Sequence, residues 1–172
     1  MFPGADLISN LIWIFTLILI VRAFMSWAPE LLYSQVGRSV VAATEWYLAP
    51  IRRVIPPAGG IDISFIVGFL ILVGLQTFLR SNSIVAAVRA IVTSVLFLII
   101  ILLLIRIFFA FFHMDPWHPI TQMVTSATEP FAQPFRGFFP RKYNQFDWAP
   151  VAAFVVVLAA DFLVLQFLPS GA

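Results

Sequence analysis

Four long apolar runs constrain the fold of this chain more than any other feature. A helix needs roughly 17 to 25 apolar residues to cross about 30 Å of hydrocarbon. Hydrophobic residues make up 62% of the 172 residues and charged residues only 10%, whereas a soluble domain carries roughly 25% charged residues. A globule of this size cannot hide so much apolar surface. We therefore predict an all-α membrane protein with four transmembrane helices, at Leu7–Trp27, Ile63–Leu79, Ser83–Phe112 and Trp148–Leu168.

A polar, proline-marked segment between the first two runs is repeated between the last two. A shift of 84 residues, without a gap, aligns six identical residues, which indicates an internal duplication. We therefore predict two tandem repeats, residues 1–82 and 83–172, each a helix, an amphipathic segment and a helix, within one membrane domain. The aligned pairs are Arg22 with Arg106, Thr44 with Thr128, Glu45 with Glu129, Pro50 with Pro134, Arg52 with Arg136 and Pro56 with Pro140, and Asp62 meets Asp147 if one residue is inserted.

The polar segment from Glu30 to Ile61 carries apolar residues at roughly helical spacing, interrupted by arginines and a glutamate. This pattern predicts a short amphipathic helix that lies at the membrane surface. Prolines fix the backbone and remove a donor. We therefore expect Pro50, with Pro56-Pro57 and Gly59-Gly60, to break the helix into a rigid turn.

Three arginines lie within the apolar runs. We expect Arg22 to extend its side chain to the interface, and the alternative is that it is a buried partner for a carboxylate. Arg89 and Arg106 would lie about 25 Å apart along one helix. This separation favours an arginine anchor at each interface over a buried ionic site.

The two motif glutamates form the most informative set of charges. Glu45 and Glu129 have Arg22 and Arg106, or Arg52 and Arg136, as candidate partners, since an unpaired charge near lipid is costly. The favoured interpretation is an ion pair that pins the amphipathic segment against the helix bundle. The alternatives are a site that docks a lipid headgroup or a protein partner, and a pathway for an ion or solute.

Two polar side chains lie within the predicted spans. Asp161 corresponds to Gln76 of the first repeat if the inserted residue is counted. A carboxylate in hydrocarbon costs roughly 2.5–3.5 kcal/mol at the helix centre. We therefore expect both side chains to face the bundle interior.

The remaining residue types give little support for chemistry. His113, Asp115 and His118 could ligate a metal, but their spacing fits no standard zinc site and two prolines interrupt the segment. No catalytic grouping is present, and the chain has no cysteine. A net charge of +2 does not indicate a nucleic-acid partner. We predict no enzymatic activity, no cofactor and no metal.

The distribution of basic residues predicts an orientation. The two motif segments carry six Lys and Arg residues, and the connection between the repeats carries two. Cytoplasmic loops of membrane proteins are enriched in these residues. We expect the motif segments to be cytoplasmic and both termini to lie on the other side. The basic pairs Arg52-Arg53 and Arg141-Lys142 could also contact anionic lipid headgroups.

The first motif closely resembles the signature of the YggT (also YlmG) family, in which a TEP-xxx-PIRR-xIPP-xGG-xDxSP stretch lies between two membrane spans. The residues that carry the resemblance are Thr44-Glu45, Pro50-Ile51-Arg52-Arg53, Ile55-Pro56-Pro57, Gly59-Gly60 and Asp62-Ile63-Ser64. Bacterial members commonly carry two such units, as this chain does. Trp46 and Phe65 replace two prolines of the signature, although Pro130 and Pro150 keep them in the second copy.

The resemblance implies a bacterial inner-membrane protein. Family members are connected with osmotic or extracytoplasmic stress and with cation uptake, and relatives with cytochrome maturation, nucleoid distribution or division. We therefore expect a non-enzymatic protein that organises or assembles membrane components, in contact with the bilayer and with another membrane protein. The alternative is a channel-like or transport component for a cation such as potassium, with Gln76 and Asp161 lining a path between the repeats.

Overall fold

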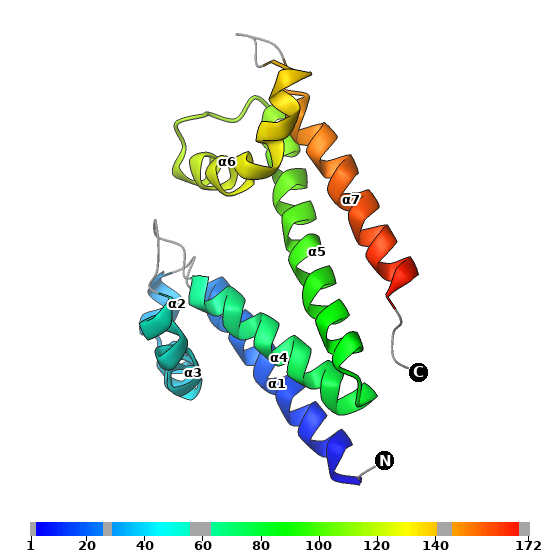
Figure 1. Cartoon of the computed structure of the whole chain (residues 1–172). Coiled ribbons are helices and arrows are strands. Elements are labelled where there is room, and N and C mark those ends of the chain that lie inside the picture. Colours follow the sequence, from blue (N-terminus) through cyan, green and yellow to red (C-terminus); the bar gives the residue numbers. More distant parts are fainter. Residues whose placement is uncertain (1–2, 26–28, 56–62, 141–145, 169–172) are drawn as a thin grey trace. The chain divides into compact units, whose positions relative to one another are not determined.

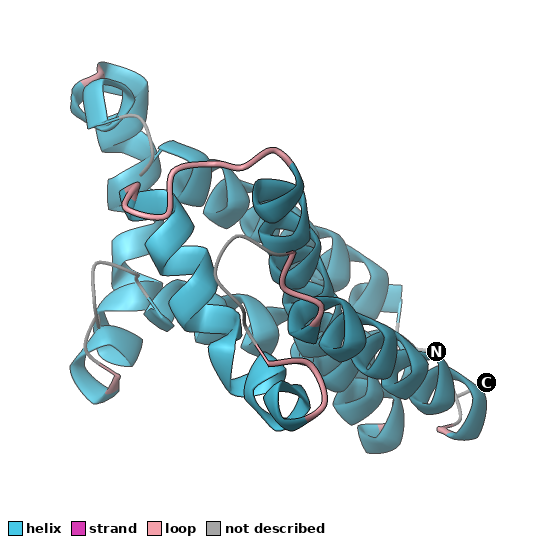
Figure 2. Ribbon diagram, turned by 90° about the horizontal axis from the view of Figure 1, so that it is seen from above, coloured by secondary structure: helices cyan, strands magenta, loops and turns pink. Residues whose placement is uncertain are grey.

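A computed structural model describes residues 3–25, 29–55, 63–140 and 146–168. All regular structure within these ranges is helical (Figures 1 and 2), so the prediction of an all-α chain is confirmed for them. The helices form two compact units, and the boundary lies between Ile91 and Val92, within a single helix. The elements are α1 (Pro3–Met25), α2 (Pro29–Tyr33), α3 (Gln35–Val54), α4 (Ile63–Ser81), α5 (Ile84–Phe111), α6 (Pro119–Ala132), the 3-10 helix η1 (Gln133–Gly137) and α7 (Ala149–Phe167).

Each of the four apolar runs forms a helix. Three are long and apolar enough to cross a membrane: α4 over Ser64–Ser81, α5 and α7. The apolar part of α1, Leu7–Ala23, is shorter. A helix satisfies its backbone hydrogen bonds within itself, which is the condition for entering hydrocarbon.

The apolar helices leave much of their own surface uncovered. Leu11 of α1, Phe97 of α5 and Phe162 of α7 each expose more than half of their surface. Side chains of this size, exposed along whole helices, require an apolar solvent. The exposure therefore agrees with an integral membrane protein.

The N-terminal unit is built from α1, α3 and α4, which all pack against one another (Figure 1). Its core consists of one leucine from each helix, namely Leu19, Leu48 and Leu72. Gly68 allows α3 to approach α4 closely, because a Cβ at this position would lie 3.1 Å from side-chain atoms of Leu48 and Tyr47. The Tyr47 hydroxyl donates a hydrogen bond to the Gly68 carbonyl at 2.8 Å.

The C-terminal unit holds the rest of α5 together with α6, η1 and α7. Both α6 and η1 pack against α7, and Ala132 and Ala153 are fully buried. Leu103 of α5 is fully buried as well, and it lies 84 residues after the fully buried Leu19. The duplication seen in the sequence therefore extends to core positions of the two units.

The predicted break at Pro50 is wrong. Pro50 lies inside α3, which continues to Val54. Because a proline nitrogen carries no hydrogen, only the bond to the Trp46 carbonyl is lost, and Trp46 is on the exposed side of the helix. The predicted turn residues Pro56-Pro57 and Gly59-Gly60 lie outside the described residues.

The second copy differs at the equivalent position. There α6 ends at Ala132, and Pro134 is the second residue of the 3-10 helix η1, which begins at Gln133. This copy has a second proline, Pro130, four residues earlier, where the first copy has Trp46. Two prolines at this spacing remove two bonds from successive turns, which explains why the α-helix tightens here and not in α3.

Candidate functional site: two arginine clusters

The first cluster joins the end of α1 to the middle of α3. Arg22 donates from one terminal nitrogen to the Thr44 hydroxyl at 2.7 Å and from the other to Glu45 Oε2 at 2.5 Å. Its Nη1 also approaches the Val41 carbonyl at 3.4 Å. The other oxygen of Glu45 accepts from Arg52 at 2.9 Å. One carboxylate thus holds two guanidinium groups from two helices.

The second cluster repeats this arrangement with the equivalent residues. Arg106 of α5 donates to the Thr128 hydroxyl at 3.0 Å and to Glu129 Oε2 at 2.8 Å, and it approaches the Thr125 carbonyl at 3.4 Å. Arg136 of η1 donates to both oxygens of Glu129, at 2.6 and 3.0 Å. Each of these partners lies 84 residues after its counterpart in the first cluster.

Asp147 adds a second carboxylate to this cluster. Its Oδ2 lies 3.3 Å from Arg136 and 3.7 Å from Arg106. Its other oxygen accepts from the backbone amide of Ala149 at 3.2 Å, at the start of α7. Asp147 therefore ties the start of the last span to the arginines. The residue that matches it in the first copy, Asp62, lies outside the described residues.

Local sequence explains why the threonine and the glutamate can share one arginine. The hydroxyl of Thr44 donates to the Val40 carbonyl one turn earlier, and Thr128 donates likewise to Val124, each at 2.7 Å. Because its hydrogen points to the helix backbone, the hydroxyl oxygen has a lone pair that faces away from the helix. The arginine donates a hydrogen bond to this oxygen. The fork of a guanidinium then reaches the neighbouring carboxylate with its second nitrogen.

The clusters correct the expectation for two of the arginines in the apolar runs, Arg22 and Arg106. Arg22 exposes only 13% of its side chain and Arg106 only 7%, so both are covered by protein and paired, and neither side chain is freely extended as expected. The alternative, a buried partner for a carboxylate, describes Arg22 correctly. The prediction of interface anchors in place of a buried ionic site is wrong for Arg106. A pairing between helices outweighs hydration here because each arginine meets both a carboxylate and a hydroxyl.

The electrostatics of the second cluster favour ionised partners. The hydrogen bond from Arg136 lowers the pKa of Glu129 to about 2; partial burial opposes this shift, and Arg106 adds to it. Glu129 in turn raises the pKa of Arg136. Both groups are therefore charged at neutral pH. The carboxylate of Glu129 titrates far from pH 7, so it is a poor group for proton transfer at that pH. The cluster is better suited to holding helices together.

The other described motif residues make none of the hydrogen bonds of the clusters. Arg53 and Pro140 are exposed. Pro134 forms part of η1. Pro56 lies outside the described residues. One buried nitrogen of Arg136, Nη1, has no hydrogen-bond partner within the described part of the chain.

The two polar residues of the spans have different surroundings. Gln76 is half-buried, and its amide nitrogen donates to the Ser9 carbonyl of α1 at 3.3 Å. Asp161 is also half-buried, but its buried Oδ1 finds no hydrogen-bond partner among the described residues. Gln76 therefore joins two helices of the N-terminal unit, whereas Asp161 keeps an unsatisfied oxygen.

The histidine segment has a structural role that the sequence analysis missed. The imidazole of His118 accepts a hydrogen bond from the Ile120 amide and caps the start of α6. Asp115 accepts from the Trp117 amide at 2.9 Å. The proline that follows His118 begins the helix, which is a common start signal. Among the described residues, no group of three or more metal-ligating side chains is found.

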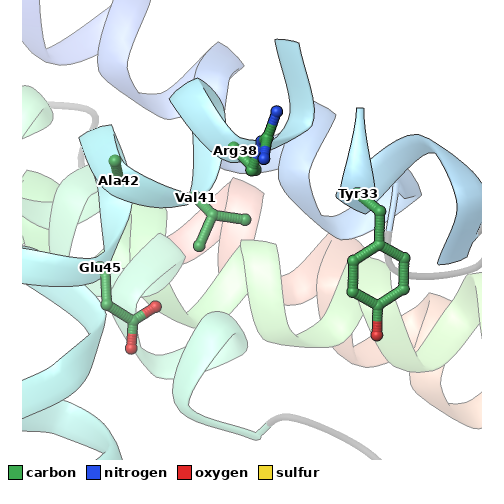
Figure 3. Close-up of a pocket in the computed structure, with 5 residues that line it drawn as sticks. All are labelled: Tyr33, Arg38, Val41, Ala42 and Glu45. Carbon is green, nitrogen blue, oxygen red and sulfur yellow. The ribbon is translucent and has the colours of Figure 1, made fainter. Parts of the chain in front are cut away.

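A surface depression beside the first cluster was not predicted either. It has a volume of about 450 Å³. Figure 3 shows Val41 between the ring of Tyr33 and the carboxylate of Glu45. The depression is lined by Tyr33 of α2 and by Arg38, Val41, Ala42 and Glu45 of α3.

Comparison with known proteins gives a consistent result. The CCB3/YggT family model matches the chain twice, over residues 1–83 and 85–168. The uncharacterized protein YggT of Escherichia coli K12 is 26% identical over 177 residues, covering 95% of this chain and 90% of that protein. The uncharacterized protein PA0392 of Pseudomonas aeruginosa is 25% identical over 170 residues, covering 91% and 85%.

A shorter relative matches only part of the chain. The uncharacterized protein ycf19 of Guillardia theta is 38% identical over 60 residues, which is 34% of this chain and 66% of that protein. No solved structure matches.

Proposed function

Because this chain belongs to the CCB3/YggT family, we propose that it is a four-span inner-membrane protein that organises or assembles other membrane components without catalysing a reaction. In this proposal α1 is the fourth span, beside α4, α5 and α7. The motif segments lie on the cytoplasmic face and contact the bilayer, its anionic headgroups and a membrane protein partner. Osmotic or extracytoplasmic stress is the condition under which this role is needed.

The observation that carries the proposal is the repeated arginine cluster. In each unit one arginine of a span holds the threonine and the glutamate of the following surface segment. The arginine Cα atoms belong to apolar helices, whereas the glutamates belong to helices with exposed outer faces. Each cluster therefore fixes a surface helix to a span, and it leaves that outer face available to a partner.

The exposed face of α3 has the composition of an interaction surface. Val36, Trp46 and Val54 each expose more than two thirds of their surface. The exposed Arg38 and Arg53 lie on the same helix. Large apolar groups beside cations suit the headgroup region of a bilayer or an amphipathic partner.

The test is the double variant Glu45→Ala and Glu129→Ala. Each substitution removes the glutamate that pairs with both arginines of its cluster, and only Asp147 of the second cluster remains as a carboxylate partner, for Arg106 and Arg136. We therefore expect lower thermal stability in detergent and reduced recovery of crosslinked partners from membranes. Glu30→Ala, which removes an exposed carboxylate, is the control. Unchanged stability and unchanged crosslinks in the double variant would overturn the proposed role of the clusters.

A transport component is the second candidate, favoured by the unsatisfied oxygen of Asp161. A carboxylate inside an apolar helix is a common mark of an ion or proton pathway. In reconstituted liposomes, this function predicts potassium or proton flux that disappears in Asp161→Ala. Absence of flux with the wild-type chain would contradict it.

A further inference from the structure

The depression on α3 contains a cation that the clusters do not use. The side chain of Arg38 is exposed, and within the described residues no hydrogen bond or ion pair to its guanidinium is found. Arg38 and Glu45 are seven residues apart, about 10 Å along the helix axis, and both oxygens of Glu45 are held by Arg22 and Arg52. In Figure 3 the guanidinium and the carboxylate lie on different sides of Val41.

The rest of the depression is apolar. Val41, Ala42 and the ring of Tyr33 form its lining between the two charged ends. A ligand that fits must offer an anion to Arg38 and a hydrocarbon surface to these side chains. A membrane phospholipid has both, with the phosphate directly above the acyl chains.

The charge of the helix selects among phospholipids. Helix α3 contains three arginines, Arg38, Arg52 and Arg53, and one glutamate, so its net charge is +2 (3 − 1). Helix α6 contains Glu129 and no lysine or arginine, so its net charge is −1. A net-negative headgroup is therefore attracted to α3 and not to α6.

The second copy also lacks the cation of the depression. The residues 84 positions after Tyr33, Arg38 and Ala42 are Trp117, Gln122 and Ser126. An aromatic residue is kept, but the arginine becomes glutamine and the alanine becomes a polar residue. The aromatic ring, the arginine and the alanine of the depression therefore occur together only in the first of the two copies.

We propose that the depression formed by Tyr33, Arg38, Val41, Ala42 and Glu45 binds one anionic phospholipid, whose phosphate pairs with Arg38. The acyl chains lie over Val41, Ala42 and the ring of Tyr33. This inference rests on the proposed function only in placing α3 at the membrane surface. It adds a defined lipid site that one repeat has and the other lacks.

The experiment measures lipid binding by the full-length chain in detergent. Native mass spectrometry with phosphatidylglycerol gives the affinity for the first bound lipid. Arg38→Gln, which installs the residue of the second copy, is expected to weaken that affinity at least about tenfold, as for the loss of a hydrogen bond to a charged group. Arg53→Gln removes the same charge from α3 outside the depression, and we expect less than about a twofold change.

A steric variant separates the site from general attraction. Ala42 is exposed, so Ala42→Leu fills the depression without disturbing the core, and we expect it to weaken phosphatidylglycerol binding although no charge changes. Phosphatidylcholine, which has no net charge, is expected to bind the wild-type chain more weakly. Equal losses for Arg38→Gln and Arg53→Gln, or undiminished binding in Ala42→Leu, would overturn the site.

The outcome is distinguishable from a failure of the proposed function. Arg38 takes no part in the arginine clusters, so Arg38→Gln should leave thermal stability unchanged while lipid binding falls. The variants of Glu45 and Glu129 are read by stability and crosslinking instead. If this surface instead binds a peptide or a second copy of the chain, the phosphatidylglycerol affinity should be the same in all variants. That result would also contradict the lipid site.

Discussion

The guanidinium fork explains why the motif needs a threonine and a glutamate side by side. One terminal nitrogen of Arg106 binds the Thr128 hydroxyl and the other binds Glu129. A lysine in this position would offer one compact charge and could not span both acceptors in the same way. The threonine hydroxyl and the glutamate carboxylate, on the same turn of a helix, therefore act as two acceptors for one planar guanidinium group.

At this scale the acid dependence of stability can be predicted. The pKa of Glu129 is lowered to about 2 in the folded chain, from an ordinary value of 4.5. A lowered pKa means that ionised Glu129 stabilises the fold above pH 4.5 and that this contribution is lost as the pH falls towards 2. Glu129→Gln should therefore unfold at a lower temperature than the wild type near pH 7.

The same variant provides the pH test. The difference in unfolding temperature between wild type and Glu129→Gln should shrink as the pH falls from 4.5 to about 2, measured by circular dichroism in an acid-stable detergent. Glu30→Gln, at an exposed position, should follow the wild type throughout. A difference that stays constant with pH would contradict the assigned role of the ionised carboxylate.

At the scale of the element, α3 and α4 approach each other closely at a glycine. Tyr47 of α3 lies against Gly68 of α4 and bonds to its carbonyl. Burial raises the pKa of the Tyr47 hydroxyl, so it remains protonated and donates this bond at neutral pH. The middle of α3 is thus held both by charge, at Thr44 and Glu45, and by close backbone approach, at Tyr47.

Gly68→Leu should separate these helices. The added side chain meets Leu48, Tyr47 and Ile51, and such overpacking costs about 1–3 kcal/mol. Gly137→Ala is the control, because nothing lies within 4 Å of the position of its Cβ. Chemical denaturation in detergent should show a clear loss for the first variant and a change within about 0.5 kcal/mol for the second. Equal stability of the two would contradict the packing described.

The positions of the helices were predictable, because hydropathy and length are read directly from the chain. The predicted run Ser83–Phe112 differs from α5, Ile84–Phe111, by one residue at each end. Pro50 was mispredicted because a single missing donor does not end a helix that buries Leu48 and Thr44 against its neighbours. Local breaking signals are weak against packing of this kind.

The residues of the two clusters could be predicted from the sequence, but the way in which they pair could not. The offset of 84 residues indicated which residues belong together, including Arg22, Glu45 and Arg52. The choice between hydration and pairing for Arg22 depends on where α3 lies beside α1, which no local pattern specifies. The depression was missed for the same reason, since Tyr33 and Arg38 become neighbours only after α2 and α3 have folded.

At the scale of the whole molecule, the proposed number of spans in each repeat predicts how the two repeats are oriented. Each repeat contains two spans in the proposed arrangement, so both copies cross the membrane in the same sense. The family model matches both copies along nearly their full length. Each unit also contains its own arginine cluster, so neither depends on the other for charge pairing.

The proposed orientation can be measured with fusions. The motif segments carry six of the Lys and Arg residues of the connections and the segment between the repeats carries two, so the positive-inside rule places the termini outside the cytoplasm. A reporter active only outside the cytoplasm, fused after Ala172, should be active. The same reporter inserted after Asn82 should also be active, since that connection lies on the same side. A cytoplasmic signal at Ala172 would overturn this orientation.

The spacing within the clusters also has a consequence for biosynthesis. Arg22 and Arg52, the outermost members of the first cluster, are only 30 residues apart (52 − 22), and Glu45 lies between them. All three are synthesised before any residue of α5, which begins at Ile84. The first cluster can therefore form while most of the second copy is still untranslated.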